Sequence, residues 1–273
     1  MATSVPKDPI VEALAEEWAR LEDLLTGLDE TAWSAPTALP GWDVKAVVAH
    51  LIGTESMLLG EPTPDVTIDP AEYQHVRNDM GRINEAWVAS MADRAPIEVL
   101  SRFRETTGRR LEALRTCDQE QWDAEGVTPV GKDTYGRFMR VRTFDCWIHE
   151  QDIRDAVSVP GGEGGAAAEL ALDEIEAALG YVVGKKAGAP AGSRVSFELT
   201  GPAARTLHVE VGERAHVVPD LAGPATTTLT MPVGVFARLA AGRGDPESLR
   251  DQVTIDGDGA LGDRIVANLA YTM

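Results

Sequence analysis

The sequence FDCWIHEQDIRDA spans residues 144–156, near the end of a helix that its pattern predicts over about 134–157. Asp145 and His149 are four positions apart and Asp152 is three positions further, so the three side chains share one face of that helix. Aromatic and aliphatic neighbours indicate that the helix is packed, and an unpaired carboxylate is costly to bury. The face therefore needs a cation: an arginine, a protonated histidine or a metal ion. The alternative is a solvent-facing Asp–His pair.

Helices of the same kind fill most of the first 160 residues. Apolar residues at spacings of three and four, interrupted by Pro and Gly, predict helices over about 8–30, 43–60, 71–92 and 96–117. Asp43 is the expected N-cap of the second helix, which carries His50 among apolar residues. A polar stretch containing glycine is expected to form a loop before residue 134. This succession is typical of a helical bundle.

The rest of the chain has a different character. Its pattern predicts, in order, a helix over 165–184, strands over 194–199, 206–211, 216–218 and 226–231, a helix over 232–241, a strand over 253–255 and a helix over 261–270. This is the pattern of an α+β unit. The run PGGEGG at 160–165 is the expected linker. We therefore predict a multi-domain α and α+β protein, with a helical bundle in residues 1–160 and a smaller α+β domain in 161–273.

Composition narrows the choice of partners. The chain has 273 residues, with 25 Lys and Arg against 44 Asp and Glu, a formal net charge of −19. Such acidity argues against non-specific nucleic-acid binding and against docking on an anionic membrane. Two cysteines build neither a disulfide framework nor a zinc finger, and no apolar run approaches the roughly 20 residues of a transmembrane helix. Since the N-terminus also lacks the apolar core of a signal peptide, we expect a cytoplasmic protein without nucleic-acid or membrane partners. The sequence predicts no particular oligomeric state.

Three side chains stand out as candidate metal ligands. His50, Asp145 and His149 together offer two imidazoles and one carboxylate and leave coordination positions open. Such a set suits Zn²⁺, Fe²⁺, Ni²⁺ or Mn²⁺. A histidine in an apolar environment such as that of His50 is, however, more often a core residue than a ligand.

Other motifs and residues have structural interpretations. GDGALG at 257–262 matches a dinucleotide-binding pattern but is interpreted as a turn before the last helix. Cys146 and the tryptophans are interpreted as core residues. His75 is expected to be solvated. From their local sequence alone, Arg238 and Arg243 are interpreted as surface arginines.

Two segments together resemble a known family. LPGWDVKAVVAHLIGTE at 39–55, followed by RTFDCWIHEQDIRDAV at 142–157, is similar to the mycothiol-dependent maleylpyruvate isomerase family, DinB-like four-helix-bundle metalloproteins of actinobacteria. VGVFARLAAGR at 233–243 and GDGALGDRIVANL at 257–269 resemble the family's C-terminal domain, a sterol-carrier-like α+β unit. The resemblance spans nearly the whole chain.

The resemblance implies a divalent metal, usually zinc, held by His50, Asp145 and His149. The isomerase has Glu at the acid position, so Asp145 is a departure by one methylene, and Asp152 is expected to assist. In the isomerase an arginine of the C-terminal domain assists thiol or substrate binding, and Arg243 is the positional match here.

The reaction that the resemblance implies uses mycothiol as the cosubstrate and a small-molecule electrophile as the substrate. The low-molecular-weight thiol is activated for addition to the electrophile, in a maleylpyruvate-type cis–trans isomerisation or an S-transfer. Two alternatives remain open. One is a metal-dependent hydrolase, in which the open coordination position carries an activated water. The other is a non-catalytic protein that binds a small ligand.

Overall fold

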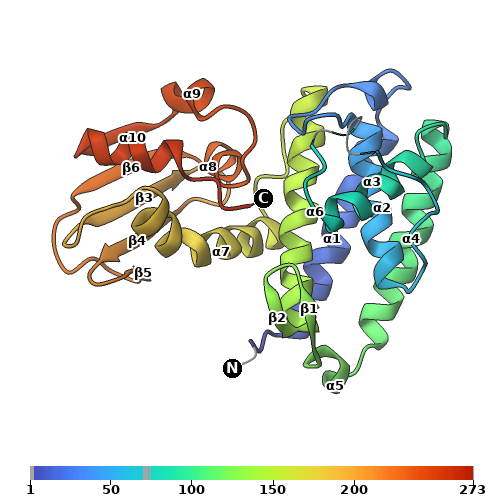
Figure 1. Ribbon diagram of the computed structural model, residues 1–273, viewed down its shortest axis with the longest axis horizontal. Helices are drawn as coiled ribbons and strands as arrows, with labels where there is room; N and C mark the ends of the chain where they lie inside the picture. Colours follow the sequence, from blue (N-terminus) through green and yellow to red (C-terminus); the bar gives the residue numbers. More distant parts are fainter. Residues whose placement is uncertain (1–2, 70–72, 74, 273) are drawn as a thin grey trace. The chain divides into compact units, whose positions relative to one another are not determined.

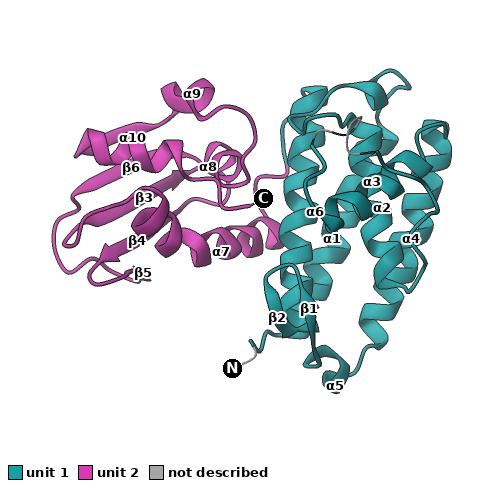
Figure 2. Cartoon of the chain, in the orientation of Figure 1, with its two compact units in different colours: residues 1–161 teal, residues 162–273 magenta. Residues whose placement is uncertain are grey.

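The computed structural model describes residues 3–69, 73 and 75–272. The chain divides into two compact units, unit 1 (residues 1–161) and unit 2 (residues 162–273), coloured separately in Figure 2. The division falls inside the PGGEGG run, one residue beyond the boundary expected from the sequence.

Unit 1 is a helical bundle (Figure 1). Its elements are α1 (Lys7–Thr26), a 3₁₀ turn (Ala32–Ser34), α2 (Val44–Leu58), α3 (Asp79–Ser90), α4 (Pro96–Thr116), α5 (Gln119–Trp122), β1 (Glu125–Thr128), β2 (Gly131–Thr134) and α6 (Tyr135–Val157). Helix α1 packs against α4 and α6, and α2 packs against α4 and α6, so these helices form a four-helix bundle. Helix α3 lies against the bundle on α2.

Side-chain caps fix the starts of the two helices that carry the candidate ligands. Asp43 accepts a hydrogen bond from the Ala46 amide at 2.8 Å, which confirms Asp43 as the N-cap of α2. Thr134 accepts one from the Arg137 amide at 3.0 Å and caps α6 in the same way. Helix α6 ends at Val157, and the capping residue after it, Ser158, adopts a left-handed backbone with φ of 56°.

Helices α2 and α3 approach closely at a glycine. A Cβ atom added at Gly53 would lie 2.4 Å from Cγ of Trp87, so the indole of α3 sits directly on the backbone of α2. Trp87 is 6% exposed. Glycine inside a helix costs stability relative to alanine, and here the close packing of a large aromatic ring offsets that cost.

The structure differs from the expected helices in two places. Helix α3 begins at Asp79, where Asn78 accepts a hydrogen bond from the Gly81 amide, and not near residue 71. Residues 71, 72 and 74 of that expected helix lie outside the described residues. The stretch expected to form a loop before residue 134 is the antiparallel hairpin β1–β2, which contacts α6. Its strands are largely solvent-exposed, with Val127 92% exposed, so the apolar alternation typical of a strand is missing.

Unit 2 is built on a sheet with strand order β5-β4-β3-β6-β7. Its elements are α7 (Ala166–Tyr181), a π-helical turn (Val182–Lys186), β3 (Arg194–Thr200), β4 (Arg205–Val211), β5 (Ala215–Val218), β6 (Thr227–Pro232), α8 (Val233–Ala240), α9 (Pro246–Leu249), a 3₁₀ turn (Arg250–Gln252), β7 (Thr254–Gly257) and α10 (Gly259–Ala267). The pair β3–β6 is parallel and the other pairs are antiparallel.

The core of unit 2 lies between the sheet and its helices. Helices α7, α8 and α10 contact the sheet, and alternate residues of β4 are buried, namely Leu207, Val209 and Val211. The prediction of an α+β unit after a helical bundle is therefore confirmed. Asp258 caps α10 directly after β7, so GDGALG is the predicted turn into the last helix. None of the described helices combines the length and apolar character needed to cross a lipid bilayer.

Candidate metal centre

Helices α2 and α6 bring three candidate ligands together. One ligand atom from each of His50, Asp145 and His149 lies within 4.8 Å of the other two. Nε2 of His50 is 3.4 Å from Oδ2 of Asp145, and Nε2 of His149 is 3.7 Å from Oδ1 of Asp145. Two ligand atoms on a tetrahedral zinc ion, each at about 2.0–2.1 Å, are about 3.4 Å apart. Each histidine nitrogen therefore lies near that separation from one of the two carboxylate oxygens of Asp145.

The electrostatics of these groups favour the protonation states that a metal needs. Burial lowers the pKa of His50, which is 7% exposed, and so favours the neutral imidazole. Burial alone would raise the pKa of Asp145, but Arg142 and the two histidines outweigh it and hold that pKa well below its usual range. A neutral imidazole and an ionised carboxylate are the ligand forms that bind a divalent cation.

Asp152 is a hydrogen-bond partner of His149 and is not itself one of the three clustered ligands. Its Oδ2 is 2.9 Å from Nδ1 of His149, and both side chains are buried. A carboxylate that accepts a hydrogen bond from Nδ1 leaves Nε2, the nitrogen that faces Asp145, available as a ligand atom. This is the usual arrangement in which a carboxylate orients a metal-binding histidine.

A chain of ion pairs holds the carboxylate of Asp145 in place. Arg142, one turn earlier on α6, forms an ion pair with Oδ2 of Asp145. Arg142 also donates to Oε1 of Glu55 from Nε at 3.0 Å and from Nη2 at 2.8 Å, while Arg110 donates to Oε2 of Glu55 at 2.9 Å. The four charges alternate in sign, so none of the three buried groups, Arg142, Glu55 and Arg110, is left uncompensated, and the chain ends at Asp145, whose side chain is 30% exposed.

Trp42 contacts the candidate centre, which corrects the interpretation of the tryptophans as core residues alone. Its ring centroid is 5.2 Å from that of His50 and 6.4 Å from that of His149. Its Nε1 donates to Oε2 of Glu85 at 2.9 Å. His75, expected to be solvated, has Nε2 at 2.8 Å from the same oxygen.

Neither Cys146 nor Arg243 belongs to the three-ligand cluster, which consists of His50, Asp145 and His149. Cys146 is fully buried, and burial raises the pKa of its thiol, so it is a core residue and not a thiolate nucleophile at neutral pH. Arg243 belongs to unit 2, where its Nη1 donates to the Ala241 carbonyl at 3.0 Å. Its part in binding the thiol or the substrate stays a prediction.

A second group of buried charges lies between α1 and α6. Glu17 and Glu150 are both fully buried, and Arg20 approaches both carboxylates. Arg154 adds a further ion pair to Glu150 at 2.8 Å. Burial, together with the negative charge of Glu150, raises the pKa of Glu17 well above its usual value.

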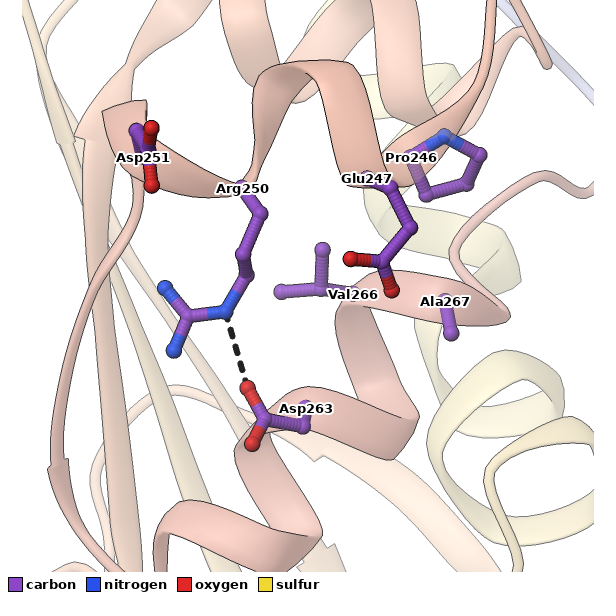
Figure 3. A pocket seen from close by; sticks show the side chains of 7 residues that line it. All are labelled: Pro246, Glu247, Arg250, Asp251, Asp263, Val266 and Ala267. Carbon is purple, nitrogen blue, oxygen red and sulfur yellow. Dashed lines mark hydrogen bonds and ion pairs between the residues drawn. The ribbon is translucent and has the colours of Figure 1, made fainter.

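A groove in unit 2 offers different chemistry. It encloses about 520 Å³ and is lined by Pro246, Glu247, Arg250, Asp251, Asp263, Val266 and Ala267 (Figure 3). Arg250 donates to Asp263 at 2.8 Å and neutralises one of the carboxylates. Because its lining contains neither histidine nor cysteine, this groove lacks the donor set of the cluster on α2 and α6.

Comparison with known proteins covers both units. The family model of the mycothiol maleylpyruvate isomerase N-terminal domain matches residues 14–154, and that of the MDMPI C-terminal domain matches residues 169–264. Two Mycobacterium tuberculosis proteins, both described as uncharacterized, are 26% identical over 151 residues, which is 55% of this chain and 57% of each relative. The chain thus matches little more than half the length of these relatives.

Solved structures show the same fold over most of the chain. The crystal structure of the mycothiol-dependent maleylpyruvate isomerase aligns with a TM-score of 0.58 and 19% identity, covering 92% of this chain and 93% of that one. A histidine-to-alanine mutant of that enzyme aligns with the same TM-score and 18% identity. Since the N-terminal family model alone takes in more than half of the residues, the chain belongs to the mycothiol-dependent maleylpyruvate isomerase family.

Proposed function

We propose that the chain is a metal-dependent enzyme that uses mycothiol to attack a small electrophilic substrate, either as a maleylpyruvate-type cis–trans isomerase or as a thiol S-transferase. The observation that carries the proposal is the convergence of His50, Asp145 and His149 within 4.8 Å in a chain of this family. Three protein ligands leave a coordination position free, as in catalytic and not structural zinc sites.

The residues of unit 1 have separate parts in this proposal. A divalent metal bound by the three ligands would lower the pKa of a bound thiol, so that the thiolate is available at neutral pH. Asp152 keeps the proton on Nδ1 of His149 and so keeps Nε2 free to bind. Arg142 holds the carboxylate of Asp145 in place and limits its freedom to rotate away.

The two reactions share their first step. The thiolate sulfur forms a bond to one carbon of the substrate's double bond, and the π electron pair moves onto the conjugated carbonyl as an enolate. In the isomerase, rotation about the resulting single bond is followed by collapse of the enolate, which re-forms the double bond in the trans geometry, breaks the C–S bond and releases the thiolate. In the transferase the enolate instead takes up the proton that the thiol lost, and the C–S bond persists. We assign Arg243 to a carboxylate of the substrate or thiol, because a guanidinium binds a carboxylate through two parallel hydrogen bonds.

The proposed partners are a low-molecular-weight thiol and a small electrophile, and the proposed compartment is the cytoplasm. Cys117 and Cys146 are both free thiols, as expected of a protein from a reducing compartment. The acidic net charge of −19 gives no support to nucleic-acid binding.

Metal content tests the site directly. Protein expressed in an actinobacterial host should hold about one divalent metal ion per chain. His149→Ala should lose that metal, whereas His216→Ala, which removes an exposed histidine of β5, should retain it. Equal metal content in the two variants would show that the site is assigned wrongly.

A product assay separates the possible reactions. Purified protein is incubated with mycothiol and maleylpyruvate, with and without a chelator. An isomerase forms the trans product without consuming thiol, and a transferase consumes one thiol for each adduct. Loss of either activity on chelation supports the proposal. Turnover without thiol points to the metal-dependent hydrolase, and metal binding without turnover in this assay removes the support for both thiol reactions.

A further inference from the structure

The two histidines of the candidate centre are held by different means. His149 is oriented by Asp152 through its Nδ1, at 2.9 Å. Nδ1 of His50 is buried and has no hydrogen-bond partner among the described residues. The polar contact of His50 is the one to Asp145 at 3.4 Å, through the nitrogen that faces the other ligands. The orientation of the His50 ring must therefore come from packing.

Trp42 supplies that packing. The indole precedes α2 and lies 5.2 Å from the His50 ring, with an angle of 36° between the two planes. His149 also contacts His50, with their centroids 4.9 Å apart, and lies 6.4 Å from Trp42. Aromatic rings at these separations are in direct contact, so rotation of the His50 ring requires movement of the indole.

Trp42 is itself held in place by Glu85 of α3 and by His75 of the segment before α3. Oε2 of Glu85, which is 3% exposed, accepts the indole N–H at 2.9 Å and also meets Nε2 of His75 at 2.8 Å. The His75 ring covers the neighbouring turn, because a Cβ added at Gly41 would lie 3.0 Å from its Cε1. Gly41 has φ of +82°, a conformation that favours glycine.

We propose that Trp42 is a positioning residue of the metal centre: it orients His50 as Asp152 orients His149, and Glu85 with His75 fixes Trp42 in turn. This inference rests on the proposed function, since it assumes that His50 is a metal ligand. Partners that orient a ligand histidine commonly contribute 10–100-fold to metal affinity. At His50 the indole orients the imidazole through ring contact and not through a hydrogen bond.

Zinc affinity, measured by competition with a chromophoric chelator, tests the inference without reference to activity. Trp42→Leu should raise the zinc Kd by about tenfold. Glu85→Leu should have a similar effect, and Glu85→Gln, which keeps an acceptor for the indole, should remain within about threefold of wild type. The double variant Trp42→Leu/Glu85→Leu should be no worse than Trp42→Leu, because Glu85 acts through Trp42. The cobalt(II) absorption spectrum of each variant reports the ligand geometry.

Trp33→Leu is the control, because Trp33 is another tryptophan of unit 1 and is buried, at 3% exposed, whereas Trp42 is half-buried. It should lower stability and leave the zinc Kd and cobalt spectrum unchanged. A zinc Kd that is unchanged in Trp42→Leu, or raised equally in Trp33→Leu, would overturn the inference alone. Failure of the wild-type protein to bind zinc or cobalt would overturn the proposed function and this inference with it.

Discussion

Replacing Glu55 by glutamine removes a negative charge from between two buried arginines. The side chains of Glu55 and Arg110 are each 2% exposed and that of Arg142 is 4% exposed. Glutamine has nearly the same size and keeps one acceptor oxygen, so the change isolates the charge. In Glu55→Gln the guanidinium groups of Arg110 and Arg142 lose the anion that they share, and Asp145 is the anion that remains in the chain. Leaving a buried ion without its partner costs about 3–5 kcal/mol. For a unit of this size, that corresponds to a fall in Tm of roughly 6–20 °C.

Glu61 provides a control with the same number of partners. It pairs with Arg102 and Arg109, but the three side chains are 23%, 31% and 44% exposed. Water screens such pairs, so Glu61→Gln should cost no more than about 1 kcal/mol. The two variants therefore differ in burial and not in the kind of interaction removed.

The assay can follow unit 1 by itself. All six tryptophans of the chain lie at or before Trp147, so tryptophan fluorescence during urea unfolding reports unit 1. Glu55→Gln should move the urea midpoint several times further than Glu61→Gln, with the slope of the transition unchanged. Equal shifts in the two variants would refute the reasoning, because they would mean that the buried arginines are solvated or neutralised in some other way.

Two further changes test groups near α6. Asp152→Asn should weaken zinc binding by about 10–100-fold without unfolding unit 1, because it changes the carboxylate that orients His149. The control Asp155→Asn, at an exposed position of the same helix, should leave the zinc Kd unchanged in the same chelator competition. Burial raises the pKa of Glu17, so the folded protein holds a proton there more tightly than the unfolded chain does. The stabilisation from that proton is complete below the ordinary glutamate pKa of about 4.3 and is lost as the pH rises through the raised pKa of Glu17. Glu17→Gln should therefore be more stable than wild type at pH 8 and equal to it at pH 4 in urea unfolding, whereas a gain of the same size in the exposed Glu16→Gln would contradict the assignment.

Local patterns in the sequence predict most of the elements. Helix periodicity identifies α1, α2, α4 and α6 to within a few residues, and alternation identifies the strands of unit 2. The i, i+4 spacing of Asp145 and His149 already places them on one face, since that relation lies within a single helix. The sequence pattern does not place His50 beside these two residues, because its position next to α6 depends on how α2 packs in the bundle.

The supporting residues could not be predicted because their partners are remote. Glu55 lies 55 residues from Arg110 and 87 from Arg142, and neither spacing has a local signature. Trp42 has the apolar surface of any core tryptophan, and its contact with His50 follows from the angle at which the chain enters α2. The β1–β2 hairpin escapes prediction for a different reason, since strands exposed to solvent need no apolar face.

The glycine contact between α2 and α3 gives a criterion for comparing other chains of this family. Gly53 lies three residues after His50, and a side chain there would collide with Trp87 unless α3 moved outward. Glu85, which fixes Trp42, is on the same α3 helix. A relative with a larger residue at this position should therefore hold its third helix further from the second and lack the Glu–Trp support described here. The residue at this position is therefore expected to distinguish chains that can support the first histidine through an indole from chains that hold it by other means.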